Sequence, residues 1–211
     1  MFNETQLVAI KFAAKNSKNQ GELAVLRYFE THPDIGSFNF SETQWNVLKF
    51  CAEECKRQHS GEVSVYDMVV ACNEAMAYKT GEPDNVLTNN FIEQIGMLVE
   101  PIDNAKGFRK VPIGIWDGYT WIEKAKWDRV PELLETLLSS YYEGALGHQE
   151  EYSAPINSKI ESAEDEFYFE YENIHPFFDG NGRSGKILYN YLKGTLSSPQ
   201  MPPNFWGSSN P

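Results

Sequence analysis

Side chains suited to phosphate chemistry gather between His175 and Arg183 of the 211-residue chain. His175 can accept a proton near neutral pH. Asp179 offers a hard carboxylate to Mg²⁺, an ion that proteins usually hold by one or two carboxylates together with the phosphates of a nucleotide. Arg183 can clamp phosphate oxygens with two parallel hydrogen bonds. A base, a metal ligand and a phosphate clamp so close together predict a nucleotide-phosphate-binding active site in which His175 is the base.

The glycines of the same segment are suited to binding an anion through the backbone. Gly180 and Gly182 permit positive φ and close approach, so successive N–H groups can point into one concavity. That concavity leads into a helix expected to begin near Ser184, and the free amides and positive dipole end of a helix start favour phosphate. A Gly-Asn-Gly turn alone is ordinary, and a histidine before a proline is often only a helix cap. The fixed order of so many specified residues favours the functional interpretation.

Hydrophobic periodicity and capping signals predict a mainly helical chain around this segment. Ser41 to Gln44 and Ser158 to Glu161 both have the sequence of a capping box, which opens a helix. The expected helices cover approximately residues 41–58, 64–81, 90–99, 131–146, 158–174 and 184–192.

The pattern changes between Phe108 and Ile122, where residues that favour strands surround Asp117-Gly118, a strong tight-turn signal. This arrangement predicts a short β-hairpin inserted into a helical protein.

Composition excludes several classes of function. The formal net charge of −12 disfavours nonspecific nucleic-acid binding, which depends on neutralising phosphates. No apolar run approaches the ~18 residues that a membrane-spanning helix needs, and the first ten residues lack the features of a secretion signal. Cys51, Cys55 and Cys72 leave one thiol unpaired in any disulfide scheme and are expected to be buried thiols. We therefore expect a cytoplasmic protein with no membrane and no nucleic-acid partner.

The motif loop resembles the signature of Fic (filamentation induced by cAMP) proteins, His-Pro-Phe-x-Asp/Glu-Gly-Asn-Gly-Arg-x-x-Arg. Every fixed position matches except the last, where this chain has Lys186. Upstream, Gly107-Phe108-Arg109 followed by a hairpin resembles the Fic flap, and Val130-Pro131 resembles the start of the next Fic helix. The resemblance implies a Fic-type helical bundle with an inserted β-hairpin flap. It divides the chain into an N-terminal helical extension of unknown role (1–59), a Fic core (60–195) and a Pro/Ser-rich, poorly ordered tail (196–211).

The resemblance further implies a nucleotidyltransferase, a protein adenylyltransferase that moves AMP from ATP to a Ser, Thr or Tyr hydroxyl of a target protein. His175 would deprotonate the hydroxyl, and Asp179 would hold Mg²⁺ on the α- and β-phosphates. The amides of residues 180–182 would cradle phosphate oxygens; these are Gly180, Asn181, which also offers its side chain, and Gly182. Arg183 would neutralise the charge that develops in the transition state.

The resemblance also implies roles for Phe177 and for the flap. Phe177 would anchor the loop in the core. The flap, residues 109–121, would dock the target protein by strand addition.

Lys186 is the main departure from the family pattern. It stands where the second arginine of the family grips the terminal phosphate, and lysine keeps the charge but loses the planar fork. A solvated lysine in the first turn of a helix is the other interpretation. Gly182 favours AMP transfer, because Fic relatives that act as kinases carry a bulky lysine at that position. The alternatives are another nucleotide or phosphate-linked donor, including kinase-like transfer, and a non-catalytic Fic fold that binds a nucleotide or partner.

Many Fic proteins are restrained by a helix with the sequence Ser/Thr-x-x-x-Glu-Gly/Asn, whose glutamate pairs with the second arginine. Residues 139–144 match that string. Helical geometry places Glu143 nearly opposite the apolar stripe of its helix, so we expect it to face solvent and the match to be coincidental. Without a brake in the same chain, the protein would be constitutively active or restrained by a separate inhibitory (antitoxin) chain.

Overall fold

The computed structural model describes residues 1–17, 21, 23–32, 40–81, 86–116, 119–146 and 160–204. Within these ranges the chain forms eight α-helices and one short antiparallel pair of strands. The prediction of a mainly helical protein with an inserted hairpin is confirmed.

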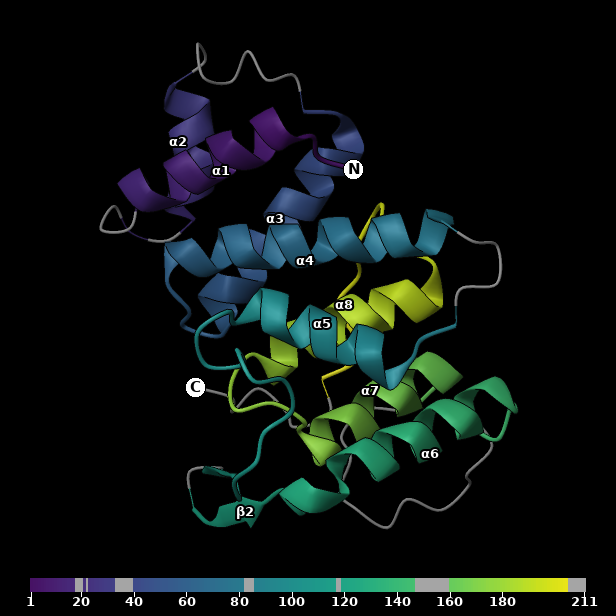
Figure 1. The fold of residues 1–211 in the computed structure, drawn as a ribbon. Coiled ribbons are helices and arrows are strands. Elements are labelled where there is room, and N and C mark those ends of the chain that lie inside the picture. Colours follow the sequence, from purple (N-terminus) through teal and green to yellow (C-terminus); the bar gives the residue numbers. More distant parts are fainter. Residues whose placement is uncertain are drawn as a thin grey trace.

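Helix α4 (Glu62–Gly81) lies across the middle of the molecule (Figure 1). On one side it packs against α1 (Glu4–Ser17) and α3 (Glu42–Arg57), and α2 (Ala24–Thr31) contacts all three. On the other side it packs against α5 (Asn89–Val99) and α8 (Asn181–Lys193). The N-terminal helices are thus connected to the rest of the chain through α4.

Helix α8 also packs against α7 (Ala163–Ile174), and α7 packs against α6 (Val130–Tyr142). The loop between α7 and α8 carries the residues that the sequence marks for phosphate chemistry. The approach of α4, α5 and α7 to α8 therefore fixes the frame of that loop.

Local signals explain most helix ends. The capping box at the start of α3 is confirmed: the Ser41 hydroxyl accepts from the Gln44 amide, and the Gln44 side chain accepts from the Ser41 amide. Two predicted starts are wrong. Ser162, not Ser158, caps α7, and Ser158 lies outside the described residues. Helix α8 begins three residues before Ser184, at Asn181, because Gly180 in the left-handed region serves as its N-cap.

The hairpin consists of β1 (Gly114–Trp116) and β2 (Trp121–Glu123), with Ile115 opposite Ile122. The predicted turn at Asp117-Gly118 lies outside the described residues. A single 3₁₀ turn, Trp127–Arg129, then leads into α6.

One hydrophobic core runs through both sides of α4. Ile10, Leu48, Met68 and Ile187 are fully buried members of it, although they come from the N-terminal extension as well as the predicted Fic core. The boundary at residue 59 therefore separates two parts of the sequence that bury a common core.

The predicted tail begins in contact with α8. The Asn190 side chain bonds to Thr195 and to the backbone of Gln200, and Leu196 is buried. Residues 205–211 lie outside the described ranges.

The three cysteines are buried free thiols, as predicted. Among the described helices, none is both long and apolar enough to cross a membrane.

Candidate active site

His175 ends helix α7 with its backbone in the left-handed region, at φ 53°. Residues before proline disfavour the right-handed helical conformation, so Pro176 explains why the helix stops here. Positive φ is uncommon for a residue with a side chain. The His175 amide nevertheless donates to the Tyr171 carbonyl at 2.9 Å, and its side chain is only 13% exposed. The ring is thus held in a defined, mostly buried position.

Arg109 fixes the loop that starts at His175. Its Nε donates to the His175 carbonyl at 2.7 Å and its Nη2 to the Ile174 carbonyl at 3.2 Å, while its amide donates to the Pro176 carbonyl at 2.9 Å. The last carbonyls of a helix have no partner within the helix, so a buried cation is well suited to satisfy them. The same guanidinium bonds to the carbonyls of Val111 and Ala125, which lie before and after the hairpin. Arg109 therefore connects the segments that flank the hairpin to His175, the candidate general base.

The surroundings of His175 keep its imidazole neutral. Burial lowers the pKa of His175 to about 3, and the charges of Lys124 and Arg109 act in the same direction. At neutral pH the ring therefore has one nitrogen lone pair available to accept a proton. Proton acceptance is the chemistry that the sequence assigns to this residue.

The start of α8 presents a helix N-terminus beside the loop. Gly180 has φ 73°, and a Cβ there would lie 2.9 Å from Val99 Cγ1, so both its conformation and its space require glycine. No side chain caps the helix start at Gly180. The first N–H groups of a helix have no partner within it and favour an anion. Gly180 itself is used differently, since its amide donates to Asp179 Oδ1 at 2.5 Å.

Asn181 holds the loop closed. Its Oδ1 accepts from the Phe177 amide at 2.8 Å, and its Nδ2 donates to the Phe177 carbonyl at 2.9 Å. Both polar atoms of the Asn181 side chain thus bond within the loop, and its predicted contact with phosphate stays a prediction. Phe177 is fully buried, as predicted, and a Cβ at Gly96 would overlap its ring.

Arg183 is buried beneath the loop with one donor atom unused. Its Nη2 donates to Glu100 Oε1 at 2.5 Å and lies 3.7 Å from Asp179 Oδ1. Its Nη1 is buried and has no hydrogen-bond partner among the described residues. A buried, unsatisfied guanidinium nitrogen is costly unless a ligand completes it, and a phosphate oxygen would be a suitable partner.

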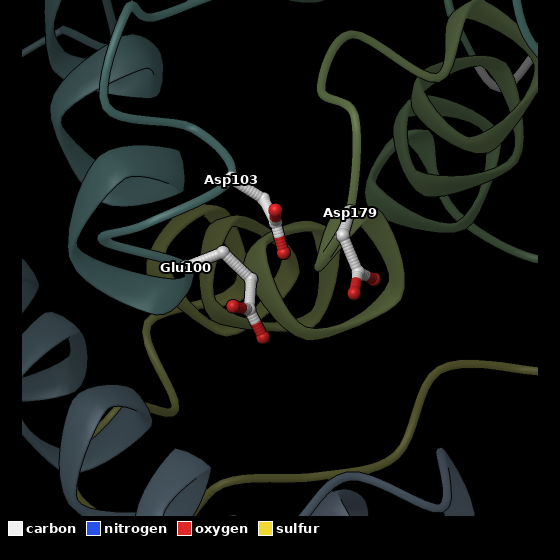
Figure 2. Close-up of side chains that lie close together, drawn as sticks. All are labelled: Glu100, Asp103 and Asp179. Atoms are coloured by element: carbon white, nitrogen blue, oxygen red, sulfur yellow. The ribbon is translucent and has the colours of Figure 1, made fainter.

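Three carboxylates converge at the open edge of the loop. Figure 2 shows Glu100 and Asp103, which follow α5, facing Asp179 from the loop. Oxygen atoms of the three groups lie within 4.8 Å of one another. Hard oxygen donors in such a group are the ligands that Mg²⁺ prefers. Asp179 was predicted as a metal ligand, whereas Glu100 and Asp103 were missed because they lie far away in sequence and belong to no motif.

Lys186 lies within a buried polar cluster formed with α3. Its Nζ donates to Glu54 Oε1 at 2.5 Å, and its side chain is 4% exposed. The alternative of a solvated lysine is therefore excluded. Arg57 Nε and Nη2 contact the same carboxylate, each at 2.9 Å, and Gln58 Nε2 contacts it at 3.0 Å. Glu54 is thus an internal anion surrounded by donors, at the position where the family resemblance places a terminal phosphate.

The charges of this cluster follow from burial and pairing. Burial opposes ionisation of Glu54, but the hydrogen bonds from Arg57 and the charge of Lys186 outweigh it and lower the pKa of the carboxyl. Burial lowers the pKa of Lys186, and the charge of Glu54 offsets part of that effect. We regard Glu54 as ionised at neutral pH. No sequence signal marked it, because it belongs to a segment without any recognised motif.

Glu143 behaves as expected from helical geometry. It follows the end of α6 and is exposed, so the string over residues 139–144 has no contact of the kind that Glu54 makes with Lys186.

The helical frame thus places a neutral histidine, a helix N-terminus without a side-chain cap and a flap around one loop. Residues 91–192 match the model of the Fic/DOC family. This matched segment, just under half of the chain, is similar to the Fic/DOC family.

Two solved structures resemble the whole chain more loosely. A Fic domain containing signaling protein from Bacteroides thetaiotaomicron matches with a TM-score of 0.51 at 16% identity, over 88% of this chain and 62% of that protein. A Fic family protein from Desulfovibrio desulfuricans matches with a TM-score of 0.53 at 16% identity, over 94% of this chain and 61% of that protein. At this identity they show the fold alone, and this chain spans about three fifths of their length. No curated protein matches the chain in sequence.

Proposed function

We propose that this protein is an adenylyltransferase that moves AMP from ATP to a serine, threonine or tyrosine hydroxyl of a target protein. The observation that carries the proposal is the neutral, fixed imidazole of His175 at the start of the loop that opens the N-terminus of α8.

His175 would act as the general base. Its free ring nitrogen takes the proton of the target hydroxyl, and that oxygen attacks the α-phosphorus. The new oxygen–phosphorus bond joins AMP to the target, and the bond to pyrophosphate breaks. Arg109 supports this step indirectly, by holding the carbonyl of the base in place.

The start of α8 would bind the phosphates. Its first amides favour an anion, and the unused Nη1 of Arg183 is a further donor next to them. These groups are already ordered before the substrate arrives, and such preorganised donors lower the energy of developing charge.

A divalent cation fits the carboxylates of Asp179, Glu100 and Asp103, because all three offer oxygen donors at one place. When bound, Mg²⁺ would neutralise negative charge on the nucleotide phosphates. Arg183 already occupies one oxygen of Glu100, which leaves Asp103 and Asp179 as the more available ligands.

Crowding at Gly182 supports AMP transfer over kinase-like transfer. A Cβ at this position would lie 2.6 Å from Gln58 Nε2. The bulky lysine of the kinase-like relatives would therefore have to displace the Gln58 side chain.

The hairpin would receive the target. Its two strands pair with each other, and each can offer its outer edge to an added strand. Trp116 and Trp121 are opposite each other and exposed, so they would provide apolar contact to the docked segment.

The first test is incubation of the purified protein with Mg²⁺ and a host-cell lysate, with ATP labelled at the α- or γ-phosphate in parallel. We expect protein label from the α-position only. General base catalysis contributes roughly 10²–10⁴-fold, so His175→Ala should lose at least ~100-fold of the transfer rate while ATP binding is kept. His32→Ala, an exposed histidine in a distant part of the chain, is the matched control. Chelation of the metal should abolish transfer by the wild-type protein.

Other outcomes would favour the alternatives. Label from the γ-position only would indicate kinase-like transfer. Transfer of label to protein from GTP, UTP or CTP, but not from ATP, would identify another donor. ATP binding without any protein label, from any donor, would favour a non-catalytic binding role.

A further inference from the structure

Glu172 is a buried carboxylate that the proposed reaction does not yet use. It lies one turn before His175 on α7, and only 8% of the residue is exposed. Its Oε1 is buried and has no hydrogen-bond partner among the described residues. Burying an incompletely paired carboxylate is costly, so its position next to the candidate base invites a functional explanation.

Both acceptors of Glu172 face the same nitrogen of His175. The carboxylate Oε2 lies 4.0 Å from Nδ1, and the backbone carbonyl of Glu172 lies 3.4 Å from it. The carbonyl is within hydrogen-bond distance and the carboxylate adds negative charge on the same side, so the two together favour a proton on Nδ1. The lone pair is then on Nε2, which becomes the nitrogen that accepts a proton from a substrate.

Gly185 provides the space for this carboxylate on the α8 side. A Cβ there would lie 3.1 Å from Glu172 Oε1 and 2.9 Å from Tyr171 Cδ1. A side chain at this position would displace Glu172 or Tyr171, so the small residue on α8 preserves the arrangement on α7.

The charged groups around Glu172 come from three other parts of the chain. Burial raises the pKa of Glu172 to about 7, while Lys186 of α8 and Lys124 after β2 act in the opposite direction. The charges of α3 have smaller effects on this pKa: Glu54 raises it and Arg57 lowers it. On α7 itself, the neighbouring titratable groups are the buried phenols of Tyr168 and Tyr171 and the imidazole of His175.

We propose that Glu172 is a positioning residue for His175: its backbone carbonyl accepts from the Nδ1–H of the imidazole, and its nearby carboxylate stabilises the imidazolium that forms when Nε2 accepts the proton of the target hydroxyl. The inference rests on the proposed transferase function. In the step itself, the hydroxyl proton moves to Nε2, the hydroxyl oxygen bonds to the α-phosphorus, and pyrophosphate leaves with the electrons of the broken bond. Glu172 takes no proton; its negative charge compensates the positive charge on the ring.

The charge of Glu172 gives the reaction a pH dependence with a definite sign. Below about pH 7 the carboxyl is protonated and cannot compensate the imidazolium, so the rate should fall. The pKa of His175 is about 3, so the base itself does not titrate in this range. The wild-type kcat should therefore rise through about pH 7.

Glu172→Gln tests this with little change in shape. We expect kcat to fall about 10- to 100-fold at pH 8, as for the loss of an orienting or charge-compensating group, while the KM for ATP stays within about twofold. The rise of kcat near pH 7 should disappear. Glu172→Asp, which keeps the charge, should retain the pH-dependent rise and more of the rate than the glutamine variant.

A measurement without substrate separates this inference from the proposed function. In wild-type protein with isotope-labelled histidine, the His175 ring signals, assigned with His175→Gln, should show a step near pH 7 as Glu172 ionises. The ring nitrogen shifts should identify Nδ1 as the protonated nitrogen. Glu172→Gln should abolish the step, and Glu170→Gln, on the same helix, should leave it unchanged.

These experiments can fail independently. A His175 ring protonated on Nε2, or a step that persists in Glu172→Gln, would overturn the inference whether or not AMP is transferred. A preserved spectroscopic step in a protein that labels no target would leave the pairing intact and refute the adenylyltransferase proposal.

Discussion

Single residues of the motif loop divide into those that hold the loop and those available to a ligand. Asn181 and Phe177 are joined by two hydrogen bonds, and both residues are buried. His175 is held by its backbone, so its ring remains available, and one nitrogen of Arg183 has no partner within the described ranges. The loop is thus ordered by its own contacts, and a nucleotide would meet a site that is already formed.

Asp103 is the exposed member of the carboxylate group that lies outside the motif loop. It is exposed and contributes an oxygen within 4.8 Å of those of Asp179 and Glu100. We expect Asp103→Asn to weaken Mn²⁺ or Mg²⁺ binding about fivefold, because one charge interaction of about 1 kcal/mol in a solvated site is lost. Titration calorimetry or Mn²⁺ electron paramagnetic resonance would measure it. Asp128→Asn, outside the group, should leave binding unchanged; equal cation affinity in both variants would show that Asp103 is not a ligand.

The candidate residues of the loop could be marked from the sequence because they are neighbours in the chain. His175, Asp179 and Arg183 owe their recognition to fixed spacing within one segment. The engaged side chain of Asn181 was not foreseen, because an amide at a loop centre can bind either a ligand or its own backbone. The contacts of Arg109 and Glu54 were missed for another reason: their partners lie 66 and 132 residues away in the chain, and spacing carries no information about such contacts.

Among the elements, α3 has the most consequence for the site. It was predicted as a helix with a correct capping box but without a role. The structure places its Glu54 against Lys186, which is the contact that the family resemblance implies for an inhibitory glutamate. The sequence left open whether the chain carries its own brake, and this contact makes Glu54, in the N-terminal extension, a candidate for one.

Removing the charge of Glu54 should make the site more receptive to ATP. Charged hydrogen bonds exceed neutral ones by about 1 kcal/mol, so Glu54→Gln should lower the KM for ATP about fivefold and raise transfer at low ATP accordingly. Glu53→Gln is the matched control, since Glu53 is exposed on the same helix. Initial rates with α-labelled ATP, together with thermal melts of both variants, would measure the effect.

The opposite result would also be informative. If Glu54→Gln keeps its melting temperature but binds ATP no better than the wild type, Glu54 is a structural partner of Lys186 and Arg57. A separate inhibitory chain would then be the remaining form of restraint.

At the scale of the whole molecule, the N-terminal helices share a core with the domain that carries the site. α1 and α3 pack on α4, and buried residues from all three belong to one cluster. The family model begins only at residue 91, so α4 and everything before it lie outside the matched segment. Sequence patterns could mark a boundary near residue 59 because motifs end there, but they could not reveal that the two sides bury each other.

A chain that lacks residues 1–59 should therefore not fold. α4 would lose α1 and α3 as packing partners, exposing apolar area worth about 25 cal/mol per Å², and Lys186 would remain buried without Glu54, a loss of about 3–5 kcal/mol for a broken buried pair. Stabilities of whole domains are only about 5–15 kcal/mol. We expect the full chain to unfold in urea in one cooperative transition, followed by circular dichroism, and the fragment 60–211 to show no cooperative transition. A fragment with a dispersed NMR spectrum and a sharp transition would instead establish residues 60–195 as an independent core and reduce the N-terminal helices to an attached regulatory element.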